Sequence, residues 1–323
     1  MTTPILGIDI AKRKVDVVLL AEEKPRHKVF TNDARGFAEL AGWIREHGAL
    51  TVHACMEATG RYGEDLARFL DDAGHVVSVV NPAQIKAFGM SELSRTKTDK
   101  TDAGVIARFC LHHGPRPWKP AAPEIRELQD LSRYLYHLMA ARQREKNRLH
   151  ARIASTAVVE STLTVVECLD GRIREIRTRI REHIRRHATL KAKHDLLVTT
   201  PGIGETTAVK ILAEIPDVDS FESARAAAAF AGVTPREHLS GSSVRGKARM
   251  SKVGNARLRK ALYLPAVVAM RCNPIVRAMA ERLRSRGKIP MVIVGAAMRK
   301  LLHIAYGILK HKKPFDPAIA VAR

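Results

Sequence analysis

The chain has 323 residues, enough for two domains with separate cores, and 46% of them are hydrophobic, an ordinary share for a soluble protein. Its 55 Lys and Arg outnumber its 33 Asp and Glu, which gives a formal net charge of +22. Such an excess is more than solubility requires and is typical of a protein that binds a polyanion, most often nucleic acid. A disordered chain is excluded, and a metabolite enzyme is disfavoured.

No membrane span or export is expected. The start of the chain lacks a basic segment, and Arg299 and Lys300 interrupt the most apolar C-terminal run. We expect a soluble, cytoplasmic protein. The cysteines are far apart and form no CxxC pair, which argues against a zinc ribbon and a disulfide framework. They are Cys55, Cys110, Cys168 and Cys272, and the first two are expected in the core.

The first part of the chain predicts a mixed sheet. Residues 4–20 read as a hairpin around a polar turn at 11–14, and 27–31 as a third strand. Asn32 or Asp33 is placed to cap a helix that runs to about residue 47.

Strand and helix then alternate. The predicted elements are a strand over 50–58, a helix over 62–73 that Gly74 ends, a strand over 76–80, a helix over 83–91, and a helix from Asp99 to about His113 with Thr98 as its N-cap. A three-strand meander followed by this alternation is the order of an RNase H-like fold.

Four acidic residues stand out in this region. Asp9 and Glu57 lie inside apolar strands, where an ionised carboxylate is costly unless it is paired or bound to a metal. Asp99 and Asp102 are three residues apart and therefore share one face of their helix. In an RNase H-like sheet these four carboxylates can meet, and a shared divalent cation would explain them.

A proline-rich break at 114–123 marks the first domain boundary. Residues 124–195 contain no proline and predict long helices, with an interruption around 155–162. Ile173, Ile176, Ile180 and Ile184 form an apolar stripe that a second helix must cover. The arginines around them are individually best explained as a solvated face, whereas their excess over Glu favours contact with phosphates.

The last part of the chain predicts further helices around two polar segments. The first, Pro201-Gly202-Ile203-Gly204, resembles the hairpin of helix-hairpin-helix motifs, whose backbone N–H groups hold a phosphate; a plain tight turn is the alternative. The helices are expected over 205–215, 221–231, 254–271, 274–286 and 290–310, with Met270, Met279, Met291 and Met298 as core residues.

The second polar segment, 234–252, is long and rich in Ser, Gly and basic residues. A loop of this kind is usually disordered or functional. Its serines stand beside Arg245, Lys247 and Arg249, so one of them is a candidate nucleophile for a phosphodiester. From the residues alone, a phosphate-binding loop is the better interpretation.

Several motifs in this order resemble the insertion-sequence one-ten family of transposases, DNA recombinases guided by a structured bridge RNA. The resemblance runs from about residue 5 to 315, with no departure at a motif position. It rests on Gly7-Ile8-Asp9, Glu57-Ala58-Thr59-Gly60, Asn81-Pro82, Lys97-Thr98-Asp99, Asp102-Ala103, Pro201-Gly202-Ile203-Gly204, Phe230-Ala231-Gly232-Val233-Thr234-Pro235, Ser240-Gly241-Ser242-Ser243 and Arg299-Lys300-Leu301-Leu302.

The resemblance implies three regions. They are a RuvC-like catalytic domain over 1–115, a helical coiled-coil region for assembly over 124–195, and a C-terminal transposase domain over 196–323. It further implies that Asp9, Glu57, Asp99 and Asp102 form a tetrad that binds Mg²⁺ or Mn²⁺. The nucleophile would be Ser240, which precedes Gly-Ser-Ser, rather than Ser242, Ser243 or Ser251.

The partners implied are target and donor DNA, the bridge RNA, and further copies of the chain in a dimer or tetramer. The location implied is the cytoplasm of a bacterium, in association with the nucleoid. The residues expected to contact nucleic acid are Lys97, Gly202, Gly204, Arg236, Ser242, Ser243, Arg245, Lys247, Arg249 and Lys252.

Three other interpretations stay open at this point. A Holliday-junction resolvase or nuclease would use the same tetrad with metal-activated water. A sugar kinase or actin-like ATPase also begins with a Gly-Ile-Asp strand, but the chain lacks a glycine-rich phosphate loop after Asp9. A non-catalytic nucleic-acid scaffold explains the charge and leaves the four acids unexplained.

Overall fold

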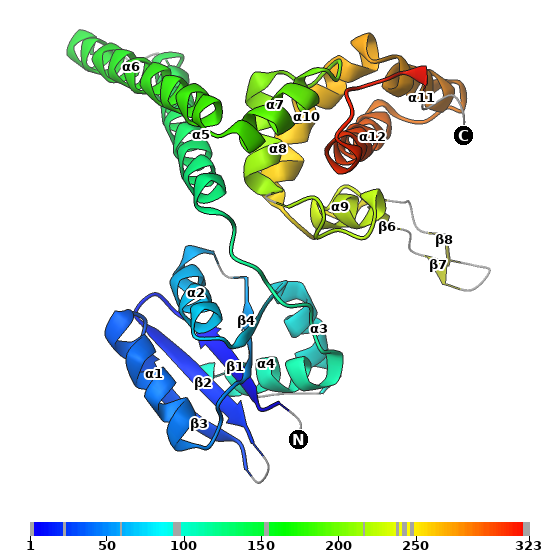
Figure 1. Ribbon diagram of the computed structural model, residues 1–323. Helices are drawn as coiled ribbons and strands as arrows, with labels where there is room; N and C mark the ends of the chain where they lie inside the picture. Colours follow the sequence, from blue (N-terminus) through cyan, green and yellow to red (C-terminus); the bar gives the residue numbers. More distant parts are fainter. Residues whose placement is uncertain are drawn as a thin grey trace. The chain divides into compact units, whose positions relative to one another are not determined.

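The computed structural model describes residues 3–21, 24–58, 60–92, 98–151, 155–215, 217–236, 239–240, 244–245 and 249–318. For Ser240 and Arg245 it describes the backbone alone. The chain forms two compact units, residues 1–120 and 121–323 (Figure 1). Each unit has its own core and is treated separately below.

The first unit is built on a five-stranded mixed sheet in the order β3-β2-β1-β4-β5 (Figure 1). Its strands are β1 (Ile5–Ile10), β2 (Lys14–Leu20), β3 (Arg26–Thr31), β4 (His53–Glu57) and β5 (Val76–Val80). The first three form an antiparallel meander, and β4 and β5 run parallel to β1. The predicted meander followed by strand-helix alternation is confirmed, and the unit has a mixed α/β fold.

Helices cover both faces of this sheet. On one face, α1 (Ala34–Glu46) and α2 (Glu64–Asp72), which the short η1 (Arg61–Gly63) precedes, pack on alternate residues of β1, β2 and β4. On the other face lie α3 (Pro82–Ser91) and α4 (Asp99–His113). Because side chains alternate across a strand, residues 5, 7 and 9 of β1 face α4, while 6, 8 and 10 face α1 and α2.

Gly7 allows α4 to approach the sheet closely. A Cβ at this position would lie 2.3 Å from the backbone oxygen of Ala103 and 2.4 Å from the backbone nitrogen of Ala107. Only a residue without a side chain fits in that space. The strand that carries Asp9 and the helix that carries Asp99 and Asp102 are therefore held in backbone contact.

The second unit begins with an antiparallel pair of long helices, α5 (Pro123–Leu149) and α6 (Thr156–Arg186). The predicted stripe Ile173, Ile176, Ile180 and Ile184 is buried, and Leu128, Leu135 and Leu138 of α5 lie in the same core. The prediction that a second helix covers the stripe is confirmed. The interruption falls earlier than expected, between Leu149 and Thr156, and a second break occurs at His187.

The remaining helices of this unit share one core with α5 and α6. They are α7 (Ala188–Val198), α8 (Glu205–Glu214), α9 (Ala224–Phe230), α10 (Ala256–Cys272), α11 (Pro274–Ser285) and α12 (Pro290–His311). Residues 121–323 therefore form one compact unit, and the separate roles expected for 124–195 and 196–323 stay predictions.

The segment 234–252 contains two short antiparallel ladders where the sequence predicted a loop. One pairs β6 (Pro235–Arg236) with β9 (Arg249–Met250), and the other pairs β7 (Leu239–Ser240) with β8 (Val244–Arg245). The segment is thus a two-step hairpin along its described residues. Ser242, Ser243 and Lys247, as well as Lys97 in the first unit, lie outside the described residues.

Two minor expectations are settled by burial. Cys55 and Cys110 are buried as predicted. Met298 is buried, but Met291 is 63% exposed, so its assignment to the core is wrong.

In the described part of the chain, α12 alone is long and apolar enough to cross a membrane, and half of its most apolar stretch is buried inside the protein. That is weak evidence for a span, because the core helix of a soluble protein has the same properties.

Candidate active site

All four predicted carboxylates lie on the first unit, toward the face that α4 covers. Asp9 precedes the last residue of β1, and Glu57 ends β4, the parallel neighbour in which Met56 is paired with Ile8. Both side chains are half-buried. Cys55 packs in the core beneath α4, so Glu57, two residues on, belongs to the same face.

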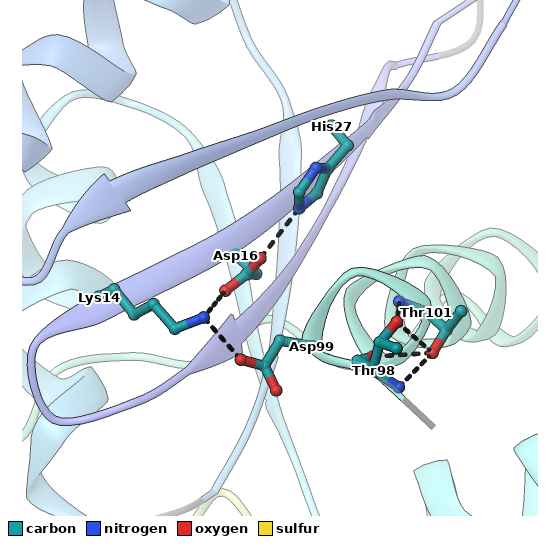
Figure 2. Close-up of polar contacts among 6 residues, drawn as sticks. All are labelled: Lys14, Asp16, His27, Thr98, Asp99 and Thr101. Carbon is teal, nitrogen blue, oxygen red and sulfur yellow. Dashed lines mark hydrogen bonds and ion pairs between the residues drawn. The ribbon is translucent and has the colours of Figure 1, made fainter. Parts of the chain in front are cut away.

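Helix α4 brings the other two acids to this face. Thr98 caps the helix, as predicted: its Oγ1 accepts from the Thr101 backbone N–H at 3.2 Å, and its own N–H donates to Thr101 Oγ1 at 2.8 Å (Figure 2). Asp99 and Asp102 therefore occupy the first turn, where the helix dipole favours negative charge.

The electrostatics of Asp9 show that the acids lie close to one another. Burial raises the pKa of the Asp9 carboxyl, and the negative charges of Asp102, Asp99 and Asp16 raise it further. The i, i+3 pair on the helix and the acid on the strand are thus near enough to influence one another's charge. The accumulated negative charge makes this the strongest candidate site of the described chain for a bound cation or a catalytic carboxylate.

A network of polar contacts ties this site to the neighbouring strand β2 (Figure 2). The Lys14 ammonium lies 2.7 Å from Asp99 Oδ2 and 3.1 Å from Asp16 Oδ2. On the other side of Asp16, His27 Nε2 lies 2.9 Å from Oδ1. Asp16 is buried, whereas the Asp99 side chain is 53% exposed. The ammonium of Lys14 consequently lowers the pKa of Asp99, and both carboxylates raise the pKa of Lys14.

Asp16, Lys14 and His27 were not among the residues predicted from the sequence. Asp16 carries the same signal that singled out Asp9, an acid within an apolar strand, so the signal was present in Val15-Asp16-Val17. Lys14 is separated from Asp99 by 85 residues, and no local pattern predicts that contact.

The carboxylates are chemically suited to a divalent metal, although they are not arranged around one. Along the described residues, no three His, Cys, Asp or Glu side chains group closely enough to hold a metal ion. The donors are hard oxygens of the kind that Mg²⁺ prefers, and the repulsion that raises the pKa of Asp9 is what a dication would relieve. The donor set therefore fits the metal, and Lys14 now supplies positive charge to one member of it.

The predicted nucleophile belongs to the other unit. Ser240 lies on β7 and pairs in register with Val244 of β8, in the hairpin that also carries Arg245. The carboxylates belong to residues 1–120 and Ser240 to residues 121–323, so the convergence of the two stays a prediction.

The base of this hairpin gathers positive charge. Arg236 on β6 and Arg249 on β9 are directly paired across the ladder, and both are exposed. Like charges in this relation repel unless an anion lies between them. Lys252 follows in a left-handed conformation with φ 58°, also exposed. These three predicted contact residues form a cationic surface suited to a phosphate.

In the turn between α7 and α8, backbone geometry and packing require a glycine at position 202. Ile203 N–H donates to the Thr200 carbonyl at 2.9 Å, and Gly202 has φ 99°, the geometry of a Pro-Gly type II turn. A Cβ at Gly202 would lie 2.7 Å from the Ala269 Cβ of α10. Gly204 precedes α8 as its N-cap. The turn geometry and packing explain Gly202 without a ligand, and phosphate contact at Gly202 and Gly204 remains a prediction.

A basic cavity of about 260 Å³ opens beside the same turn. Arg177, Arg181 and Arg185 of α6 line it together with Lys210 of α8. Burial, Lys260 and Arg177 lower the pKa of Lys210, whereas Tyr136 raises it. Asp195 and Glu205 also line the cavity, so its excess of positive charge is partly compensated. By contrast, Arg172 and Arg179 on α6 pair with Glu175, as a solvated face would. The arginine-rich helix thus has one paired face and one face that lines the cavity.

A mixed sheet with clustered carboxylates in one unit, and cationic surfaces in the other, define an enzyme that acts on nucleic acid. Residues 6–158 match a family profile described as Transposase, and residues 194–281 match one described as Transposase IS116/IS110/IS902 family. The chain belongs to the IS110 family of transposases, the insertion-sequence one-ten family that its motifs resemble.

Relatives span the whole chain. It is 36% identical to the pilin gene-inverting protein of Moraxella bovis and 35% identical to that of Moraxella lacunata, in each case over 99% of this chain and 99% of the relative. It is 25% identical to the transposase for insertion sequence element IS1111A of Coxiella burnetii, over 83% of this chain and 78% of the relative. A solved T. thermophilus RuvC in complex with a Holliday junction substrate aligns with 36% of this chain and 100% of that chain, at 14% identity and a TM-score of 0.26.

Proposed function

We propose that this transposase cleaves, exchanges and rejoins DNA strands through a covalent 5'-phosphoserine intermediate on Ser240, with a divalent cation at Asp9, Glu57, Asp99 and Asp102. A structured RNA would select the target and donor sequences. The observation that carries the carboxylate half of the proposal is the close packing of α4, which begins with Asp99 and Asp102, on the strand that carries Asp9. The raised pKa of Asp9, caused by burial and by these acids, agrees with it. The Arg236–Arg249 pair at the base of the Ser240 hairpin supports the other half, the reaction of Ser240 with a DNA phosphate.

In the proposed reaction the Ser240 hydroxyl oxygen attacks the phosphorus. The Oγ–P bond forms, the P–O3' bond breaks, the hydroxyl gives up its proton, and the leaving 3'-oxygen gains one. One phosphodiester replaces another, so the step can reverse on a second strand without ATP. A bound Mg²⁺ would polarise the phosphate and stabilise the leaving oxygen. The chain's own cations would hold the phosphate backbone, and the RNA would read the sequence, which suits a net charge of +22.

The test uses purified protein, RNA from the flanks of the element, labelled target DNA and Mg²⁺, followed by denaturing gels before and after protease. We expect a slow-migrating DNA band that protease removes, that requires the RNA, and that Ser240→Ala abolishes. Free cleaved strands without such a band, still produced by Ser240→Ala, would instead identify a RuvC-like resolvase or nuclease that uses metal-activated water. That alternative uses the same carboxylates and leaves Ser240 without a role.

A second experiment asks whether the carboxylates and Ser240 act within one protomer. Ser240→Ala and Asp102→Ala proteins are each expected to be inactive. If the site is shared between protomers of a dimer or tetramer, mixing them restores strand cleavage. If mixing restores nothing while either variant mixed with wild type forms the same oligomers, the site is contained in one chain.

A further inference from the structure

Lys14 is a cation that contacts the carboxylate site through Asp99. Its ammonium bridges two elements, reaching Asp16 on its own strand at 3.1 Å and Asp99 on α4 at 2.7 Å (Figure 2). The side chain is 47% exposed. Neither Lys14 nor Asp16 belongs to the tetrad assigned above.

Asp16 is what holds Lys14 in this position. It lies opposite Asp9 in the β1–β2 register, and its side chain is only 6% exposed. A carboxylate so buried requires partners, and it has two, His27 on β3 and Lys14. Because the strand backbone and His27 fix Asp16, the Lys14 ammonium is tethered on the sheet side of Asp99.

We propose that Lys14 is an internal counter-ion, displaced from Asp99 when a divalent cation binds the carboxylate site. The inference rests on the metal site of the proposed function. Lys14 takes up Asp99 Oδ2, and no three of the described acids are gathered into a metal cluster. A dication and an ammonium on one carboxylate repel each other, so ligation by Asp99 should open this contact. Lys14 then stays beside the site through Asp16.

The proposal predicts the direction in which Lys14 affects metal affinity. Mn²⁺ binding to the full-length protein is measured at fixed pH and ionic strength by the electron paramagnetic resonance signal of free Mn²⁺. Lys14→Met should tighten the binding by about threefold to tenfold, the effect of one charge near a partly exposed site. Lys14→Arg, which keeps the charge, should bind like wild type.

Lys12→Met is the matched control. Lys12 is exposed on the turn of the same hairpin and forms no ion pair among the residues that the structure describes, so its loss makes the same change in net charge without opening the contact. Mn²⁺ affinity should change by less than twofold. Asp9→Asn shows how much of the Mn²⁺ binding occurs at the carboxylate site, because this substitution should remove that part of the binding.

The outcomes separate the two proposals. If no binding depends on Asp9, the metal site and the counter-ion both fall. If Asp9-dependent binding exists but Lys14→Met binds no more tightly than Lys12→Met, the metal site stands and the counter-ion is wrong. Weaker Mn²⁺ binding by Lys14→Met also overturns the counter-ion proposal. In that case Lys14 would hold Asp99 through Oδ2 and so orient its other oxygen, Oδ1, for the metal.

The displacement of Lys14 can also be tested on the wild-type protein, without any substitution. Lysine acylation is followed by mass spectrometry with and without Mg²⁺, with Lys12 as the internal reference. Release from Asp99 leaves the Lys14 amine with one carboxylate partner, so its modification rate relative to Lys12 should rise about twofold or more. An unchanged or lower ratio at saturating Mg²⁺ contradicts displacement.

Discussion

Asp9 and Asp16 lie directly opposite each other on neighbouring antiparallel strands, a cross-strand pair of like charges beneath one helix. The two residues have different surroundings. His27 and Lys14 contact Asp16, whereas burial raises the pKa of Asp9 and the charges of Asp102 and Asp99 on α4 raise it further. Asp16 thus has cationic and hydrogen-bonding partners within the protein, whereas the carboxyl of Asp9 is available to a ligand.

This difference predicts opposite effects of Asp9→Asn on activity and on stability. The amide removes a carboxylate that the reaction needs, so strand cleavage should fall by at least about 10²-fold. It also removes repulsion from Asp16, Asp99 and Asp102, so unfolding in urea should need more free energy, on the order of 0.5 kcal/mol. A loss of both activity and stability would mean that Asp9 is a structural residue.

The pH dependence of that gain follows from the raised pKa of Asp9. Between its ordinary value of 3.8 and its raised folded value, the folded protein holds a proton that the unfolded chain has lost. Stability contributed by this group is therefore lost as pH rises through that window. The advantage of Asp9→Asn should be absent below about pH 3.8, grow above it and level off toward neutrality. Urea unfolding of both proteins across pH 3–7 measures the difference. A constant advantage would place its origin elsewhere.

The sequence predicts most of the first unit because its signals are local. Strand alternation, the Thr98 cap and the spacing of Asp99 and Asp102 each depend on residues a few positions apart, and each was found where expected. The ion pair of Lys14 with Asp99 was not predictable in this way, because packing of α4 on the sheet creates it.

The second unit shows the same limit. The isoleucine stripe of α6 predicted a covering helix, and α5 covers it. The interruption predicted around 155–162 lies earlier, between Leu149 and Thr156. Thr162, a residue with weak helix preference, lies within α6, where it is buried and donates its hydroxyl to the Val158 carbonyl. Pairing in 234–252 was missed because glycine and serine signal turns but do not reveal short ladders.

Gly7 should tolerate no side chain. In Gly7→Ala the Cβ meets the backbone of α4 at Ala103 and Ala107, so the helix must move away from the sheet. We expect a loss of about 2–3 kcal/mol in the free energy of unfolding, the usual cost of overpacking. The carboxylates of α4 should shift with the helix, which should lower strand cleavage as well.

Gly42→Ala is the control for this change. Gly42 lies within α1, and a Cβ there would meet nothing within 4 Å. Alanine has the better helix propensity, so this variant should be more stable by about 0.5–1 kcal/mol. Urea unfolding checks both variants. Equal effects of the two substitutions would contradict the close approach of β1 and α4.

The paired arginines at the base of the Ser240 hairpin should bind phosphate. Arg236 and Arg249 are exposed and directly opposite each other, which is unfavourable unless an anion compensates them. Each substitution by Ala should lower affinity for DNA or RNA about equally for all sequences. It should also reduce the slope of log affinity against log salt by about one.

The matched control is Arg35→Ala. Arg35 is also exposed, but it pairs with Glu39 on α1 and needs no external anion. Fluorescence anisotropy at several salt concentrations, with one DNA and one RNA of equal length, compares the three variants. If the arginine pair holds a phosphate, Arg236→Ala and Arg249→Ala reduce the slope and Arg35→Ala leaves it unchanged. Equal slopes in all three would mean that the net charge of the chain, and not this pair, accounts for binding. A reduced slope with RNA alone would assign the pair to the guide rather than to the DNA.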